Sequence, residues 1–421
     1  MKQNFLLKTL LILSFLGIIS FFLYNKFFDT SKNDIEKTDS KREIPVASSD
    51  NVTQIAESCN AFSCNLYSQL KQEDGNLFFS PFSISTALEM AYAGARGITE
   101  KEMAQVLHNT LSQEQLHPAY ANLIQTLNNE QNDSYELSVA NKLFIQKNFK
   151  LLPSFETIIK TNYTDALGFV DFVNNPQAAV DTVNNWVSLK TKEKIKDIIS
   201  TKDIDDLTRL VIANAIYFKG KWEKPFDTKS TKISTFHVDN KNNVEVNTMR
   251  KKEKYNYMEN DSLKMLELYY KEKNLSMVII LPNEIDGLQD IEKNITSETL
   301  TNWMSQLQSK KVTVEIPKFE IETSYHLKDN LKKMGMPSAF SGSANFKGMA
   351  QEPLYISKVI HKAFIKTDEE GTEAAAATVI IMAKFAMREE PKTFIADHPF
   401  IFLIKDNQTD LILFMGRLAK P

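Results

Sequence analysis

Apolar and polar residues follow two patterns along this chain, one with the period of a helix and one with the period of a strand. Helical spacing marks residues 55–70, 83–93, 100–107, 113–127, 153–160 and, with a break, 178–199. Residues 135–145 alternate as a half-buried strand does, and residues 210–218 form the continuous apolar run of a central strand. Further strands are predicted at residues 244–250, 264–270, 275–281, 312–319 and 363–366. Because helices dominate early and strands late, the pattern predicts an α+β fold.

Near the C-terminus, two apolar stretches are predicted as strands, residues 394–404 and 411–417, joined by a polar turn. The segment before them, residues 369–383, carries conflicting signals. Its four consecutive alanines favour an ordinary helix. The run from Thr378 to Ile381 favours a strand instead, and the polar, proline-ended residues 384–391 are typical of an exposed loop.

At a strand's period of two, one face of this segment carries almost only small side chains. Its members are Thr372, Ala374, Ala376, Thr378 and, as the exception in size, Ile380. Gly371 precedes them, where the backbone turns without a Cβ penalty. Such a segment could lie in an exposed loop and later enter a sheet as a strand. Its small side chains would let it enter without overpacking the core.

With these features the chain resembles the serpin family, inhibitors that trap proteases by inserting a reactive-centre loop into a sheet. The resemblance covers roughly residues 55 to 421. Seven motifs carry it in the family's order: residues 76–88, 94–103, 185–195, 214–222, 225–226, 316–319 and 359–363. It implies a serpin fold in a single domain, residues 51–421, with a large mixed or antiparallel central sheet and surrounding helices. The reactive-centre loop would be exposed at about residues 369–393.

The resemblance also implies a mechanism, that of a suicide substrate for serine endopeptidases. The hinge that would insert after cleavage matches Glu369, Glu370, Gly371, Thr372, Glu373, Ala374, Ala375, Ala376, Ala377 and Thr378. In the family's usual register the reactive bond joins Phe385 to Ala386, and the apolar Phe385 implies a chymotrypsin-like target. Cleavage after Lys384 or Arg388 would imply a trypsin-like one, and a subtilisin-like or cysteine protease would also accept Phe385. The alternative hypothesis is that the protein is a non-inhibitory serpin, acting as a binding or chaperone-like module.

Two polar clusters carry over from the family. The shutter, beneath the place where strands part, would comprise Ser80, Ser83, Asn214 and His361. The breach, where the loop enters the sheet, would comprise Trp222, Lys318 and Glu369. We expect His361 to be a hydrogen-bonding latch and Lys318 to pair with Glu369, whose charge would restrain premature insertion.

The N-terminus differs in character from the rest. Lysines flank a nearly unbroken apolar stretch, residues 9–24, as in exported proteins whose positive end stays inside. Residues 1–28 therefore read as a signal peptide or a membrane anchor. No Ala-x-Ala cleavage pattern precedes residue 29, which favours an uncleaved anchor through residues 5–24. Residues 29–50 are polar and are expected to be a flexible linker that leaves the serpin domain outside the cytoplasm, secreted or anchored.

Composition narrows the partners. The formal net charge of −3 predicts no general affinity for nucleic acid. Some serpins bind heparin through a basic helix, but the comparable residues 108–127 contain no lysine or arginine, so no heparin activation is expected. The two cysteines, Cys59 and Cys64, fall on different faces of a helix, and no disulfide between them is expected. Cys64 lies on the apolar stripe and is expected to be a buried thiol.

Motifs for catalysis are missing from the sequence. None of the six histidines belongs to a His-Glu-x-x-His pair, and neither a Gly-x-Ser-x-Gly elbow nor a phosphate-binding loop occurs. We therefore expect no enzyme activity, no metal and no cofactor. The resemblance implies a monomer whose partner is the target serine protease, held in a covalent complex.

Overall fold

The computed structural model describes residues 47–129, 135–372 and 391–421. The helices are α2 (Ser49–Leu70), α3 (Pro81–Tyr92), α4 (Gly97–Val106), α5 (Gln113–Asn129), α6 (Pro153–Asn162), α7 (Pro176–Lys190), α8 (Leu288–Lys293), α9 (Ser297–Ser305) and α10 (Lys328–Met334). The strands are β1 (Leu77–Phe79), β2 (Tyr135–Gln146), β3 (Leu167–Val170), β4 (Leu210–Lys221), β5 (Lys232–His237), β6 (Asn243–Glu259), β7 (Leu263–Tyr269), β8 (Leu275–Pro282), β9 (Gln308–Pro317), β10 (Phe319–His326), β11 (Lys358–Thr367), β12 (Gly371–Thr372), β13 (Lys392–Ile395), β14 (Phe400–Asp406) and β15 (Ile412–Leu418). The predicted α+β class is confirmed.

Helix α2 begins six residues before the predicted start at residue 55. The Ser48 side chain accepts a hydrogen bond from the backbone N–H of Asn51, at 3.2 Å, which satisfies one of the free donors of the first turn. The last residues of the expected linker, 29–50, therefore belong to this helix, and that boundary was placed too late. The helix expected at residues 178–199 ends at Lys190, where three turn residues follow.

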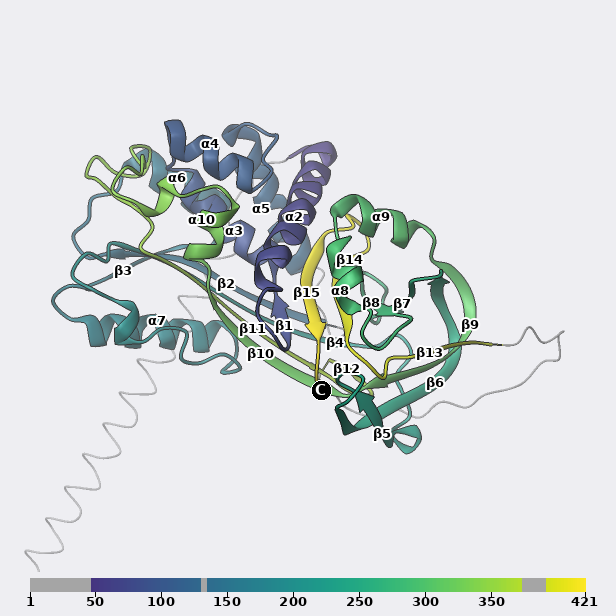
Figure 1. Cartoon of the computed structure of the whole chain (residues 1–421). Coiled ribbons are helices and arrows are strands. Elements are labelled where there is room, and N and C mark those ends of the chain that lie inside the picture. Colours follow the sequence, from purple (N-terminus) through teal and green to yellow (C-terminus); the bar gives the residue numbers. More distant parts are fainter. Residues whose placement is uncertain (1–46, 130–134, 373–390) are drawn as a thin grey trace, which may run out of the picture. The chain divides into compact units, whose positions relative to one another are not determined.

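Six strands form the sheet that matters for the site. Their order is β10-β11-β4-β2-β3, and β12 also pairs with β4. Strand β4 pairs parallel with β11 and antiparallel with β2, so the sheet is mixed. Figure 1 shows α7 on one side of these strands and α3 on the other. Side chains from alternate positions of β4 accordingly enter two separate cores, which explains why its sequence is apolar at nearly every position.

A second sheet has nine strands, in the order β1-β15-β14-β8-β7-β6-β9-β13, with β5 beside β6. Here the strand expected at residues 394–404 proves to be two strands. Strand β13 pairs parallel with β9, whereas β14 lies between β8 and β15 in the middle of the sheet. Residues 396–399 cross between these places; Pro399 has no N–H to donate to a ladder, and His398 hydrogen-bonds the Pro282 carbonyl at 2.9 Å.

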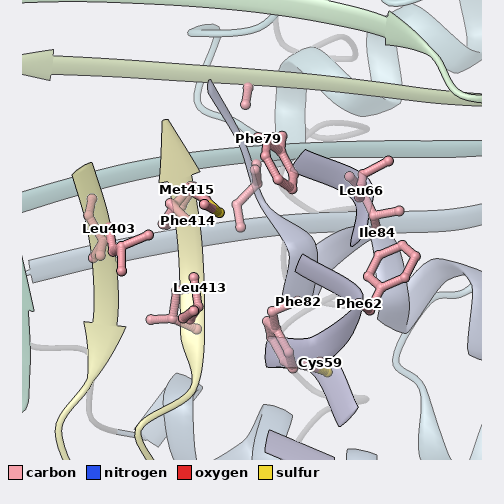
Figure 2. Close-up of a cluster of buried hydrophobic side chains, with 14 of the residues drawn as sticks. Cys59, Phe62, Leu66, Phe79, Phe82, Ile84, Leu403, Leu413, Phe414 and Met415 are labelled. Atoms are coloured by element: carbon pink, nitrogen blue, oxygen red, sulfur yellow. The ribbon is translucent and has the colours of Figure 1, made fainter. Parts of the chain in front are cut away.

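The main core joins the helices to the nine-stranded sheet. Figure 2 shows side chains of α2 and α3, among them Phe62 and Phe82, packed together beside Leu413 and Phe414 of β15. Cys59 and Cys64 are free thiols, as predicted from their different helix faces, and Cys64 is buried as expected. Cys59 is buried as well. Within the described residues no helix has the length and apolar character needed to span a membrane, and the predicted N-terminal segment lies outside them.

Candidate functional site

Two residues near the start of the predicted hinge already belong to the six-stranded sheet. Gly371 and Thr372 form β12 and pair antiparallel with Lys221 and Gly220 at the end of β4. Gly371 has φ of +149°, and a Cβ built on it would lie 1.9 Å from the Gly220 carbonyl oxygen. No other residue fits this close approach, so the glycine fixes where the chain joins β4.

Glu369 anchors the breach through both carboxylate oxygens. One accepts a hydrogen bond from the Thr231 hydroxyl at 2.7 Å, and the other pairs with the Lys318 ammonium at 2.7 Å. Burial alone would raise the pKa of Glu369, but the hydrogen bonds from Lys318 and Thr231 hold it below its ordinary value. The expected pair of Lys318 and Glu369 is thus present, with the carboxylate charged.

Trp222 holds the same turn from the other side. Its indole N–H donates to the Asp368 carbonyl at 3.0 Å, and its backbone N–H donates to the Glu370 carbonyl at 2.8 Å. The indole is buried and stacks on Tyr270, with ring centroids 4.7 Å apart. The three expected breach residues therefore meet around residues 368–370, at the start of the predicted hinge.

His361 joins two strands and a helix in the shutter. Its Nε2 accepts a hydrogen bond from the Ser80 backbone N–H at 3.1 Å, so the proton must be on Nδ1, which donates to the Asn214 side-chain oxygen. Burial lowers the pKa of His361 to about 3, and the ring is therefore neutral at ordinary pH. Tyr325 stacks on the ring at 6.3 Å between centroids. The latch role expected for His361 agrees with this geometry.

The remaining shutter groups are also joined. The Asn214 amide donates to Ser83 Oγ and to Asn141 Oδ1, and Ser83 Oγ donates to Asn141 Oδ1 at 3.1 Å. Ser80 Oγ caps α3 by accepting from the Ser83 N–H and donates to the Leu413 carbonyl at 2.6 Å. His361, Asn214 and Asn141 lie opposite one another on β11, β4 and β2, so the network crosses the line along which β11 and β4 would part.

Not every predicted residue is described, and some participants were missed. Glu373, Ala374, Ala375, Ala376, Ala377, Thr378, Phe385 and Ala386 lie outside the described residues. Asn141, Thr231 and Asp368 were not anticipated. Asn141 was visible only as a polar residue within a predicted strand, and its role depends on cross-strand register with Asn214.

Comparison with known proteins agrees with this architecture. The family Serpin, described as serine protease inhibitor, matches residues 57–421. A leukocyte elastase inhibitor from Xenopus laevis is 41% identical over 377 residues, covering 87% of this chain and 99% of that protein. Human Serpin B4 is 38% identical over 391 residues, covering 88% and 100% of the two chains. The crystal structure of Serpin48, a highly specific serpin of the insect Tenebrio molitor, has a TM-score of 0.78 at 36% identity and covers 87% of this chain and 98% of its own. The chain belongs to the serpin family, and its fold is the serpin fold.

Proposed function

We propose that the protein is a suicide-substrate inhibitor of serine endopeptidases, with chymotrypsin-like enzymes as its targets. The observation that carries this is the position of β12. Its two residues pair antiparallel with the C-terminal end of β4. The earlier part of β4 is paired with β11. The chain thus begins a new strand at the place where β4 and β11 diverge. The leukocyte elastase inhibitor among its relatives supports protease inhibition as the activity.

The register of β12 defines how the rest of the hinge would insert. Because the pairing is antiparallel, each later residue of the hinge would pair with a residue one position earlier in β4. Residues 371–382 would therefore pair with all 12 residues of that strand. Phe385 lies three residues beyond Met382. A cut after Phe385 therefore releases enough chain to cover β4 completely, with a short tether left to the bound protease.

The same register assigns the faces of the inserted strand. Ala374 and Ala376 would lie opposite Phe218 and Ile216, which point into the main core, and Thr378 would lie opposite Asn214 of the shutter. Paired residues of an antiparallel ladder share a face. The small residues of the hinge would therefore lie on the face of the sheet that packs against the main core. Their small side chains suit this face, because little space is left there.

Insertion requires β11 to leave β4. Seven residues of β11, Lys358–Phe364, are paired with β4, and the bond between His361 and Asn214 lies in the middle of that ladder. These interactions form a barrier that keeps the uncut protein in a metastable arrangement, and cleavage frees the hinge to cross it.

The chemistry belongs to the protease. Its nucleophile attacks the Phe385 carbonyl, the bond to Ala386 breaks, and Ala386 departs as a new amino terminus while Phe385 is held as an acyl-enzyme. Insertion then moves the protease with the hinge and distorts its catalytic geometry, so that water no longer releases the ester. The inhibitor contributes the stored free energy and acts once.

Incubation with chymotrypsin tests this function. We expect a covalent band that survives detergent, and a released C-terminal fragment that begins at Ala386. Chymotrypsin whose serine has been blocked is the control and should give no band. Clean cleavage without a complex would support a substrate or binding role instead, and a fragment beginning after Lys384 or Arg388 would assign a trypsin-like target.

The Glu369→Lys substitution tests the breach. It replaces an ion pair by two like charges at Lys318 and removes the acceptor of Thr231, so the hinge should open and the protein should polymerise faster on warming. Size-exclusion chromatography after timed incubation measures the loss of monomer. Glu322→Lys is a matched control, because Glu322 is exposed and its substitution breaks the 2.7 Å pair with Lys362 on the same sheet without touching the hinge. Equal polymerisation of both variants would contradict the role of Glu369.

The N-terminal region belongs to the proposal. Residues 1–28 direct export, residues 29 to about 47 form a linker, and the serpin domain acts as a monomer outside the cytoplasm. Fractionation of expressing cells, with N-terminal sequencing of the product, distinguishes an uncleaved anchor from a cleaved signal peptide. Recovery of the full chain from the cytoplasm would reject both.

A further inference from the structure

Lysines gather on β6, β9 and the residues after β4, at one end of the nine-stranded sheet. We call this the basic surface; it consists of Lys224, Lys252, Lys254 and Lys311. Lys252, Lys254 and Lys311 are exposed and share one face of the ladder, and Lys224 is half-buried. Lys254 lies directly opposite Lys311 in the ladder of β6 and β9, and Lys224 reaches the same place by donating to the Lys254 carbonyl at 3.0 Å.

Ion pairs balance little of this charge. Among the described residues, Lys252, Lys254 and Lys311 form no ion pair, and the carboxylates of Glu223 and Glu315 are paired with Lys273 and Arg250. Glu253, between two of these lysines, accepts a hydrogen bond from the Lys254 backbone N–H at 2.9 Å. Like charges directly opposite each other destabilise a sheet. This concentration of positive charge, in a chain of net charge −3, lowers the local stability of the sheet. Locally unfavourable charge arrangements are expected where a surface has a function.

The basic surface lies beside both ends of the reactive-centre loop. Lys392, where β13 begins after the loop, is opposite Val312, the residue that follows Lys311. At the N-terminal end of the loop, the Glu370 carbonyl accepts a hydrogen bond from the Trp222 backbone N–H. Trp222 lies two residues before Lys224 in the sequence. A protease that binds residues 373–390 would therefore meet this surface with the rim of its own active site.

We propose that the basic surface docks a target protease whose face around the active site is acidic, and that it speeds their encounter. The inference rests on the proposed function, since it takes the loop as the bait. Opposite charges around the contact raise association rates by about 10–1000-fold at low salt, and salt reduces the effect. The residue at the cleaved bond would then determine which side-chain specificity a target protease must have. The lysines would discriminate among proteases that share that specificity.

The experiment compares two forms of one protease, native chymotrypsin and chymotrypsin whose lysines have been succinylated to make its surface acidic. The triple variant Lys252→Glu, Lys254→Glu, Lys311→Glu reverses the basic surface. The matched control Lys101→Glu, Lys196→Glu, Lys333→Glu changes the net charge equally at exposed lysines on or next to α4, α7 and α10, well apart from β6 and β9 (Figure 1). Rates of complex formation are measured at low and high salt.

The unaltered protein should react faster with the succinylated enzyme than with the native one. That preference should fall by about tenfold or more in the triple variant, remain in the control, and shrink as salt rises. Equal changes in both variants, or none, would overturn the docking proposal while complexes still form. If no covalent complex forms at all, the proposed function fails, and equilibrium binding of the serine-blocked succinylated enzyme still tests docking by the same comparison. Loss of heparin binding in the triple variant, with protease rates unchanged, would assign the surface to a polyanion and reject the proposal.

Discussion

Cutting the chain after Phe385 should raise its melting temperature by on the order of 10–30 °C. The released hinge would add roughly a dozen backbone hydrogen bonds to the six-stranded sheet, each contributing about 0.5–1.5 kcal/mol. Burial of Thr378 and the alanines against the main core would add to this. Differential scanning calorimetry of intact and nicked protein measures the shift. Identical melting temperatures would remove the basis of the proposed mechanism, because no free energy would be stored.

Thr372→Arg is the variant that separates insertion from cleavage. Position 372 already pairs with Gly220 in the uncut protein, and in the full inserted strand it would share its face with Ala374 and Ala376, toward the main core. Extension of the strand past this position would enclose the side chain, and an unpaired charge is expensive to bury there. The nicked variant should melt close to the temperature of its intact form, and chymotrypsin should cleave it without being trapped. Thr372→Ser keeps a small side chain and should behave as the unaltered protein does. A detergent-stable complex with Thr372→Arg in normal yield would contradict the insertion argument.

The sequence predicted elements best where burial dictates the pattern. Strand β4 was recognisable because both of its faces are covered, so almost every position is apolar. Strand β10 was missed because it lies at the edge of its sheet, and Phe319 and Ile321 are its only buried residues among outward polar ones. The short strand β5 was missed for the same reason, since Phe236 alone is buried.

The site shows a different limit. Glu369 and Lys318 are 51 residues apart, and no local pattern joins them; the family resemblance did. Thr231 and Asn141 complete the two clusters through register and turn geometry, which depend on the assembled sheets. Residue-by-residue resemblance therefore found Glu369 and Lys318, whereas Thr231 and Asn141 were found only in the structure.

Glu89 is a buried carboxyl group on α3 that the inhibitory mechanism does not use. Its Oε2 accepts a hydrogen bond from the Asn109 amide at 3.2 Å, and its Oε1 has no partner among the described residues. Burial raises the pKa of Glu89 to about 8, and the Asn109 bond only partly opposes this. The folded protein therefore holds this group protonated at neutral pH, whereas the unfolded chain ionises it above about 4.5.

Glu89→Gln should therefore remove a loss of stability with rising pH. Between the ordinary pKa of about 4.5 and the folded pKa of about 8, the folded state binds one more proton than the unfolded state, so stability falls by about 1.4 kcal/mol per pH unit. Two buried histidines also change the stability at acidic pH, because burial lowers the pKa values of His117 and His361 to about 4 and about 3. Their unfolded forms bind protons only below about 6.5, and the buried cysteines begin to contribute only above about 9, their ordinary pKa. In the window from about pH 6.5 to about pH 8, the unaltered protein should lose about 2 kcal/mol that the glutamine variant keeps.

Urea unfolding across that window measures the two slopes. Glutamine preserves the size of the side chain and the acceptor for Asn109, so the variant should fold and should be the more stable protein at the alkaline end. Glu57→Gln, at an exposed position on α2, is the control and should leave the pH dependence unchanged. Parallel curves for Glu89→Gln and the unaltered protein would mean that Glu89 is ionised in the folded state. In that case the carboxylate would have a partner in solution, and Asn109 would be the first residue to examine, since its own side-chain oxygen is also buried without a partner among the described residues.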